Sequence, residues 1–294
     1  MSTLEDFQNL TVGQAQRVCV PLLKDAGIDD PVFEARVLLG FVLGGGPERV
    51  LADRDEQLSL AQAKALAEAL SQRCRRMPMA QIVGVREFWS LAFKVTSDTL
   101  TPRPDTETLV EAVVDHCVQP PKRILDLGTG TGCIVLALLS EWPSAVGIGV
   151  DASLEALKIA EENSRTLGLV ERVAFVSADW TGPDWTHALG APFDVVVSNP
   201  PYIPALDIEG LEPDVRDFEP RAALDGGEDG LDAYRAIVAE LPTLLAPGGL
   251  VGFEIGIGQA DDVAALLKGA GLDVVEQRAD LGGVTRVVLG HKAA

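Results

Sequence analysis

The sequence is poor in the residues that support a metal centre, a disulfide framework or a membrane span. Its four cysteines are scattered without a CxxC pair, and its three histidines have no metal-ligand spacing, so neither a zinc site nor a disulfide-stabilised fold is expected. The longest strongly apolar stretch, about Cys133 to Leu139, is far shorter than the roughly 20 residues of a membrane-spanning helix. Glu5 and Asp6 stand where a signal peptide would carry positive charge. We therefore expect a soluble, cytoplasmic protein with no metal and no membrane partner.

Basic residues are also scarce. Lysine and arginine number 24 against 44 acidic residues, which gives a net charge of −20. A basic patch supplies most of the affinity for a phosphate backbone, so stable nucleic-acid binding is not expected. The stretch 207–232 alone holds ten acidic residues against Arg216 and Arg221. It is long for a loop in a compact domain, which is typical of a lid or a binding loop.

The length and the residue patterns predict two domains joined by a linker. In residues 1–76, apolar side chains recur at helical spacing, Asp30-Pro31 provides a helix start, and 59–74 is rich in helix-forming residues. This part is predicted to be a small all-α domain. Residues 77–103 contain β-forming runs between 81 and 100, broken by Gly84, and are predicted to be a β-hairpin linker.

Residues 104–294 alternate between strand and helix patterns. The alternation predicts an α/β domain in which an open, mostly parallel sheet has helices on both faces. Only a loop separates the final two strands, so the last strand should pair antiparallel. The expected strands are 123–127, 145–150, 172–177, 193–198, 249–254, 272–276 and 284–289, and the expected helices are 132–140, 154–167, 231–245 and 259–269.

A glycine-rich turn follows the first of these strands. Its residues are Gly128, Thr129, Gly130, Thr131 and Gly132, and glycines let a backbone approach a ligand closely. The dinucleotide fingerprint fails because Cys133 occupies its last position, and a Walker A loop fails because no GK[ST] follows. Asp126 would repel a phosphate but suits a cationic group, and Asp151 ends the next strand, where an acid can accept both ribose hydroxyls. The pattern indicates a nucleoside that carries a positive charge.

A second motif, Asn199-Pro200-Pro201-Tyr202, follows the apolar strand 193–198. The two prolines remove backbone donors and restrict φ, so their carbonyl oxygens are held at the edge of the sheet where α/β folds bind ligands. An NH₂ group could donate one hydrogen to the Asn199 side chain and one to the Pro200 carbonyl, while Tyr202 offers a flat face. The nitrogen of that NH₂ group would then be oriented for methylation without a general base.

With these motifs the sequence resembles the class I S-adenosylmethionine-dependent methyltransferases, which have a Rossmann-like fold, and within them the release-factor glutamine methyltransferases (the HemK family). The resemblance runs from about Arg75 to the C-terminus. Besides NPPY it rests on Pro78-Met79-Ala80-Gln81-Ile82-Val83-Gly84, Glu87-Phe88 and Thr101-Pro102-Arg103-Pro104-Asp105-Thr106-Glu107. Gln81 departs from the family's usual aromatic residue or histidine, and 281–284 match their segment loosely.

The resemblance implies a cofactor, a substrate and roles for particular residues. Gly128 to Gly132 would wrap the methionine part of S-adenosyl-L-methionine, Asp151 would hold its ribose, and Asp179 and Trp180 would flank its adenine. Asn199 to Tyr202 would hold the substrate glutamine, in the Gly-Gly-Gln loop of a peptide chain release factor. The helical domain and the acidic stretch would grip that protein. Arg103 and Glu107 are candidates for the cofactor pocket, a hinge or a structural ion pair, and Glu254 for lining the pocket.

Other functions stay open on the sequence alone. A sister family methylates a glutamine of a ribosomal protein and usually differs at the positions of Asp105-Thr106-Glu107. A nucleic-acid methyltransferase could use the same NPPY geometry on an exocyclic amine of a flipped base. A non-catalytic binding module with a degenerate methyltransferase fold is the remaining alternative, which the intact glycine turn, Asp151 and NPPY disfavour.

Overall fold

The computed structural model describes residues 6–294, so Glu5 of the signal-peptide argument lies outside it. The chain divides into two compact units. The first unit holds the residues up to 84 together with Glu212–Phe218, and the second holds Val85–Leu211 and Glu219–Ala294. Among the described residues, none of the helices is long and apolar enough to cross a bilayer. In the same part of the chain, no group of three metal-ligating side chains is placed to hold an ion.

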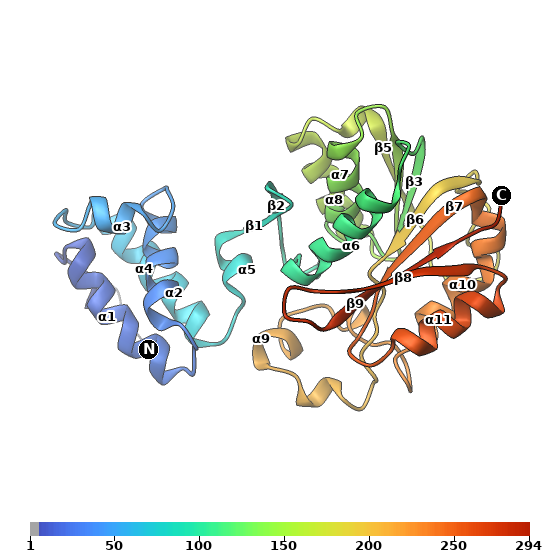
Figure 1. Cartoon of the computed structure of the whole chain (residues 1–294). Coiled ribbons are helices and arrows are strands. Elements are labelled where there is room, and N and C mark those ends of the chain that lie inside the picture. Colours follow the sequence, from blue (N-terminus) through green and yellow to red (C-terminus); the bar gives the residue numbers. More distant parts are fainter. Residues whose placement is uncertain (1–5) are drawn as a thin grey trace. The chain divides into compact units, whose positions relative to one another are not determined.

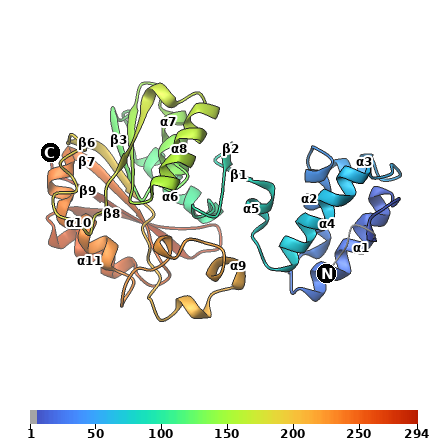
Figure 2. The ribbon, with the colours of Figure 1, turned by 180° about the vertical axis from the view of Figure 1, so that it is seen from behind.

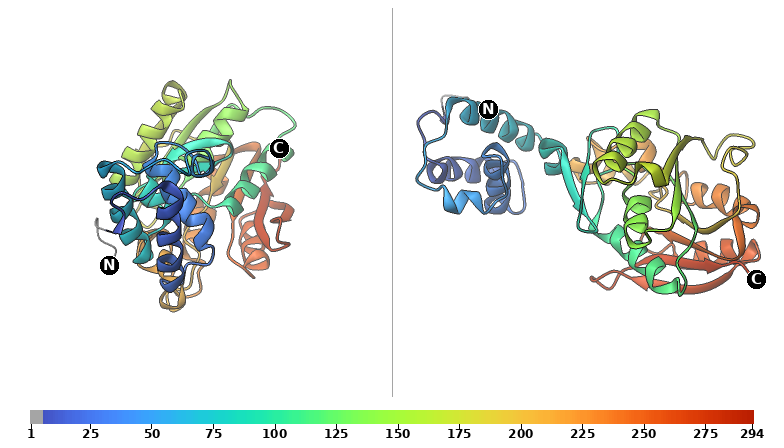
Figure 3. Two further views of the ribbon diagram at one scale, coloured as in Figure 1. Left: turned by 90° about the vertical axis from the view of Figure 1, so that its left-hand side faces the viewer. Right: turned by 90° about the horizontal axis from the view of Figure 1, so that it is seen from above.

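The first unit is built from helices, which confirms the all-α prediction for this part of the chain. Reciprocal capping boxes start two of them, with Thr11 and Gln14 at one and Ser59 and Gln62 at the other, and Asp30 caps a third. Their apolar faces pack into one core, and Figure 3 shows these blue helices lying together. The helices are α1 (Val12–Asp25), α2 (Pro31–Val42), α3 (Arg49–Ala52), α4 (Leu60–Cys74) and α5 (Met79–Val83).

The β-hairpin is shorter than predicted. Its strands are β1 (Val85–Phe88) and β2 (Leu91–Lys94), whereas Ile82 and Val83, which had been assigned to β structure, lie in helix α5. Gly84, with φ of 78°, ends that helix in the left-handed conformation, and Ile82 packs on the helical core instead of a sheet. The tertiary contact therefore overrides the β-propensity of the side chains.

The second unit contains a seven-stranded sheet with the order β5-β4-β3-β6-β7-β9-β8. All seven predicted strands are present, and only β9 runs against its neighbours, as predicted. Figure 1 shows the sheet with its strands labelled. The strands are β3 (Arg123–Leu127), β4 (Val146–Asp151), β5 (Val173–Ser177), β6 (Phe193–Ser198), β7 (Leu245–Glu254), β8 (Asp273–Ala279) and β9 (Thr285–His291).

Helices cover both faces of this sheet, because its central strands are apolar on both sides. In β6, Val195 and Val197 pack against the core under α6 and α7, while Val196 packs on the opposite side under α10 and α11. Figure 2 shows the two layers from behind. One layer holds α6 (Pro104–His116), α7 (Cys133–Glu141) and α8 (Leu154–Thr166), and the other holds α10 (Asp232–Leu244) and α11 (Ala260–Gly269).

The strand order reverses direction at β3, which places the site. The chain passes from β3 to β4 on one side, and later returns to β6 on the other side of β3. Open α/β sheets bind ligands beyond the carboxyl ends of the strands at such a reversal. The glycine turn follows β3 and the NPPY segment follows β6, so the topology brings the two predicted motifs to one sheet edge.

Candidate active site

The glycine turn has a backbone that only glycine adopts readily. Gly128, Gly130 and Gly132 have φ values of 72°, 54° and 80°, in the left-handed region. The amides of Gly128 and Thr129 both donate to the Val150 carbonyl, at 2.9 and 2.8 Å, which holds the turn against β4. A Cβ on Gly128 would lie 3.2 Å from the Trp180 ring. The turn is therefore close-packed at Gly128, whereas a Cβ on Gly130 would meet nothing within 4 Å.

Asp126 lies fully buried beneath this turn. Its Oδ2 accepts hydrogen bonds from the Thr129 hydroxyl at 2.6 Å and from the Val135 amide at 3.3 Å. Its other oxygen, Oδ1, has no partner within residues 6–294. Burial raises the pKa of Asp126 to about 7. A buried carboxyl with an unsatisfied oxygen suits a cationic ligand group, which would supply both the hydrogen bond and the missing charge.

Replacing Asp126 with asparagine should stabilise the protein at alkaline pH. A raised pKa means that the fold prefers the neutral carboxyl, so stability is lost as the pH rises from the ordinary value of 3.8 to about 7. Asparagine is neutral throughout and can still accept from Thr129. We expect Asp126→Asn to increase the free energy of unfolding by roughly 3 kcal/mol at pH 8 and much less at pH 4. Urea unfolding at both pH values measures this, and equal increments at the two would contradict it.

The structure brings Asp151 and Trp180 to the glycine turn but leaves Asp179 in a turn of its own. Asp151 ends β4, and its carboxylate accepts from the Gly130 amide at 2.9 Å and from the Ser153 amide at 2.8 Å. Burial raises the pKa of Asp151, and the backbone amides oppose this effect. Asp179 is exposed and accepts from the amide and hydroxyl of Thr181 at 2.8 and 2.7 Å.

Asn199 faces the glycine turn across a small cavity. The Ser198 hydroxyl donates to the Leu127 carbonyl at 2.6 Å, which joins the ends of β6 and β3. The Asn199 side-chain nitrogen donates to the Thr106 hydroxyl at 3.3 Å. The cavity encloses about 40 Å³, and its lining residues include Gly128 to Thr131, Asn199, Thr106 and Leu100 to Arg103. A nucleoside-sized ligand would extend beyond it, along the turn toward Asp151 and Trp180, which do not line it.

The remaining residues of the motif lie directly behind Asn199. Pro200 is buried, and Pro201 and Tyr202 are half-buried. Burial and the nearby Glu254 carboxyl raise the pKa of the Tyr202 phenol to about 12, so the ring is neutral and hydrogen-bonding. The segment thus offers carbonyl oxygens and an aromatic ring, and no group that could act as a base at neutral pH.

Comparisons with known proteins agree with this geometry. The description "PrmC N-terminal domain" matches residues 14–84, and "Methyltransferase domain" matches residues 119–251. The release factor glutamine methyltransferase of Rhodospirillum rubrum is 48% identical over 92% of this chain and 82% of its own length. The chain belongs to the release factor glutamine methyltransferase family. The family member of Caulobacter vibrioides is 45% identical over 96% of this chain and 97% of its own length.

A solved structure supports the fold of this family member. A methyltransferase from Pyrococcus furiosus matches with a TM-score of 0.55 at 15% identity, over 76% of this chain and 100% of that chain. This likeness concerns the fold of the chain, which is that of a methyltransferase with a mixed seven-stranded sheet.

Three side chains that the sequence analysis did not select hold the site of this methyltransferase together. Thr106 receives the Asn199 amide, as described above. Gln259 donates from its side-chain nitrogen to the carbonyls of Tyr202 and Gly230, at 3.0 and 3.2 Å. Glu219, whose side chain is fully buried, accepts from the Thr101 amide at 3.1 Å. Thr106 lies in the segment 101–107 that carries the family resemblance, but nothing in the local sequence marks Gln259 or Glu219, because each acts on a segment distant in the chain.

Arg103 and Glu107, which were considered as a structural ion pair, have other partners. The Arg103 guanidinium pairs with Glu219 at 3.3 Å and lines the cavity beside Asn199. Glu107 accepts from the Trp89 amide at 2.8 Å, at the turn of the β1–β2 hairpin. Arg103 therefore belongs to the site, and Glu107 supports the hairpin.

Part of the acidic stretch of this methyltransferase belongs to the first unit. Helix α9 (Pro213–Arg216) carries Asp214, which pairs with Arg73 at 2.7 Å and also with Arg76. Arg73 is 5% exposed and also forms a bidentate pair with Glu34. The stretch 207–232, which the sequence analysis interpreted as a lid or a binding loop, is thus held in part by ion pairs to a buried arginine.

Removing Arg73 should destabilise the first unit selectively. Arg73→Ala would leave the partly buried Glu34 carboxylate without its counter-charge and would leave Asp214 with Arg76 alone, so we expect a loss of about 3 kcal/mol. All four tryptophans (Trp89, Trp142, Trp180 and Trp185) lie in the second unit. The urea midpoint followed by the circular dichroism of the helices should fall, whereas the midpoint followed by tryptophan fluorescence should not change. Arg75→Ala, on an exposed side chain two positions along, is the control; equal shifts in the two variants would rule out the buried cluster.

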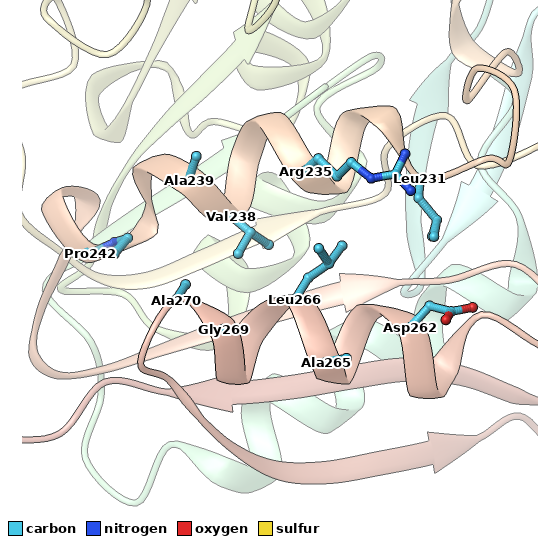
Figure 4. Close-up of a pocket in the computed structure, with 10 residues that line it drawn as sticks. All are labelled: Leu231, Arg235, Val238, Ala239, Pro242, Asp262, Ala265, Leu266, Gly269 and Ala270. Atoms are coloured by element: carbon cyan, nitrogen blue, oxygen red, sulfur yellow. The ribbon is translucent and has the colours of Figure 1, made fainter.

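A larger hollow of about 620 Å³ lies between α10 and α11 (Figure 4). Its lining is mainly aliphatic, with Arg235 and Asp262 at one end. Arg235 is paired with Asp229 at 2.5 Å and Asp232 at 3.0 Å. The hollow offers neither the glycine turn nor the NPPY segment, so it is not the candidate active site.

Proposed function

We propose that this protein binds S-adenosyl-L-methionine and methylates the side-chain amide nitrogen of the glutamine in the Gly-Gly-Gln loop of a peptide chain release factor, in the cytoplasm. The observation that carries the proposal is that Asn199 and the glycine turn line one cavity at the reversal of the strand order. The relatives named above are release factor glutamine methyltransferases at up to 48% identity.

The residues present fit the cofactor. Gly128 to Gly132 would wrap its methionine part, and the unsatisfied Oδ1 of Asp126 suits the positive charge there. The Asp151 carboxylate, held by the Gly130 and Ser153 amides, retains lone pairs for the ribose hydroxyls. Trp180 packs against Gly128 and would flank the adenine together with Asp179. When bound, the cofactor supplies an electrophilic methyl group on a sulfonium.

The chain contributes orientation to the reaction. The Asn199 side-chain oxygen and the Pro200 carbonyl would each accept one hydrogen of the substrate amide, so that its nitrogen points along the line of attack. Tyr202 would pack its ring against the planar amide. No general base is required, since the proton can leave after the methyl group has arrived. The helical domain and the acidic stretch would grip the release factor, where charge complementarity raises the rate of association and the specificity.

Intact-mass analysis tests the proposed function directly. The protein is incubated with S-adenosyl-L-methionine and a purified release factor, beside a release factor whose loop glutamine is changed to alanine. We expect one added methyl group on the first substrate and none on the second. Methylation of both would place the acceptor elsewhere in the release factor. No added mass would overturn the proposal, and a ribosomal protein and a nucleic acid would then be the substrates to try.

A further inference from the structure

Glu254 is a buried carboxyl that the proposed chemistry leaves unused. It ends β7, whose register pairs Phe253 with Ser198 of β6, so Glu254 and Asn199 leave the sheet side by side. Glu254 is 2% exposed, and its Oε2 has no hydrogen-bond partner in the described part of the chain. The Thr106 hydroxyl, itself 2% exposed, and the Tyr202 phenol lie beside this carboxyl, where hydrogen bonding to each of them lowers its pKa.

Thr106 therefore lies between the carboxyl and the catalytic amide. Its hydroxyl has one proton to donate and lone pairs to accept with. An ionised Glu254 can only accept hydrogen bonds, so the Thr106 hydroxyl donates its hydrogen to it. The lone pairs of Thr106 are then left for the side-chain nitrogen of Asn199, which donates to them at 3.3 Å. This arrangement directs the oxygen of the Asn199 amide away from Thr106, where it is free to receive the substrate.

A protonated Glu254 would allow the hydrogen bonds through Thr106 to run in the opposite direction. It could donate to Thr106, whose own proton would then be available to the oxygen of the Asn199 amide. The amide would turn over, and its NH₂ group would face the NH₂ group of the substrate glutamine. Two donors cannot hydrogen-bond to each other, so the acceptor would lose its orientation.

We propose that Glu254 is a positioning residue, whose carboxylate acts through Thr106 to set which end of the Asn199 amide faces the substrate glutamine. This inference rests on the proposed function, because it assigns the Asn199 oxygen to the substrate amide. It concerns a residue that does not line the cavity beside Asn199.

The surroundings of Glu254 place this reversal of the hydrogen bonds near neutral pH. Burial raises the pKa of the carboxyl to about 7, with Thr106, Tyr202 and Arg286 opposing the rise and Asp105 adding to it. Two further neutral groups face it, the Tyr234 phenol on α10 and the Cys133 thiol on α7. The orientation of the Asn199 amide in which its oxygen faces the substrate should therefore be lost as the pH falls through about 7.

The test is the pH profile of methyl transfer to a release factor at saturating S-adenosyl-L-methionine. For the wild type, kcat/KM for the release factor should fall about tenfold from pH 8 to pH 6, as a group with a pKa of about 7 becomes protonated. Glu254→Gln can still accept from Thr106 and cannot titrate. Asp126 also has a raised pKa, but the positive charge of the saturating cofactor would keep it ionised, so the profile of this variant should be flat over this range. A variant that is a few-fold slower at pH 8 would then be faster than the wild type at pH 6.

Two variants at position 106 separate positioning from a merely structural role. Thr106→Ser keeps the hydroxyl and should keep the wild-type pH profile, whereas Thr106→Val should be slow and flat. A pH profile that stays steep in Glu254→Gln would overturn the inference, even if that variant is less stable. Should the wild type methylate no release factor at any pH, the proposed function fails instead, so the two failures are distinguishable.

Discussion

Replacing Asn199 with alanine should lower kcat for methylation of a release factor by roughly 10²–10³-fold, the loss that follows when a reacting group is no longer held in line. Alanine removes the only side chain that lines the cavity from the NPPY segment, and with it one of the two acceptors for the substrate NH₂. The nitrogen of the substrate amide is a poor nucleophile, so its alignment contributes most of what the protein provides.

Single-turnover mass analysis and cofactor calorimetry together test this prediction. If Asn199 orients the substrate, the dissociation constant for S-adenosyl-L-methionine should change little while kcat falls. A tenfold weaker affinity for S-adenosyl-L-methionine, with a normal kcat at saturating cofactor, would show that Asn199 is a cofactor ligand instead. Asn199→Asp is the informative second variant, because aspartate keeps an acceptor but cannot donate to Thr106. Its activity should lie between those of alanine and the wild type.

The sequence was sufficient for the sheet and for the motifs at its edge. Each strand of the seven-stranded sheet is apolar enough to be recognised locally, and the glycine turn and NPPY are contiguous segments that follow strand ends. Their meeting could be inferred because parallel strands end at one edge of a sheet. The roles of individual residues within the site, such as Asp151 at the ribose, stay predictions.

The contacts that support the site could not be predicted, because they join segments far apart in the chain. Glu219 is one acid among ten in an acidic stretch, and only the fold shows that it alone turns inward to the Thr101 amide. Gln259 has the pattern of an ordinary helix start, although it holds the Tyr202 carbonyl. Similarly, Asp214 pairs with Arg73 across 141 positions in the sequence.

Gly230 lies near the end of the acidic stretch 207–232, and replacing it with alanine should displace the NPPY segment and lower activity. Gly230 has a φ of 77°, and a Cβ there would lie 2.3 Å from the Tyr202 carbonyl oxygen and 2.6 Å from the side-chain nitrogen of Gln259. The first of these atoms belongs to the backbone, so the NPPY segment itself must shift. A displacement of this size is expected to lower kcat by about 10²-fold. The left-handed backbone and the crowding together should lower the free energy of unfolding by about 2 kcal/mol.

Gly210→Ala is the matched control, because it makes the same substitution in the same stretch. Gly210 is exposed, a Cβ on it would meet nothing within 4 Å, and its φ lies outside the left-handed region. Alanine there should leave kcat within about twofold and should be neutral or slightly stabilising. If both variants kept full activity, the position of NPPY would not depend on the packing of Gly230. If Gly230→Ala lowered both kcat and the affinity for S-adenosyl-L-methionine, the displacement would have reached the glycine turn as well. A loss of kcat alone would place the effect at the acceptor side of the cavity, because Tyr202 contacts Gly230 and Gln259 through its carbonyl group while the glycine turn is held separately by β4.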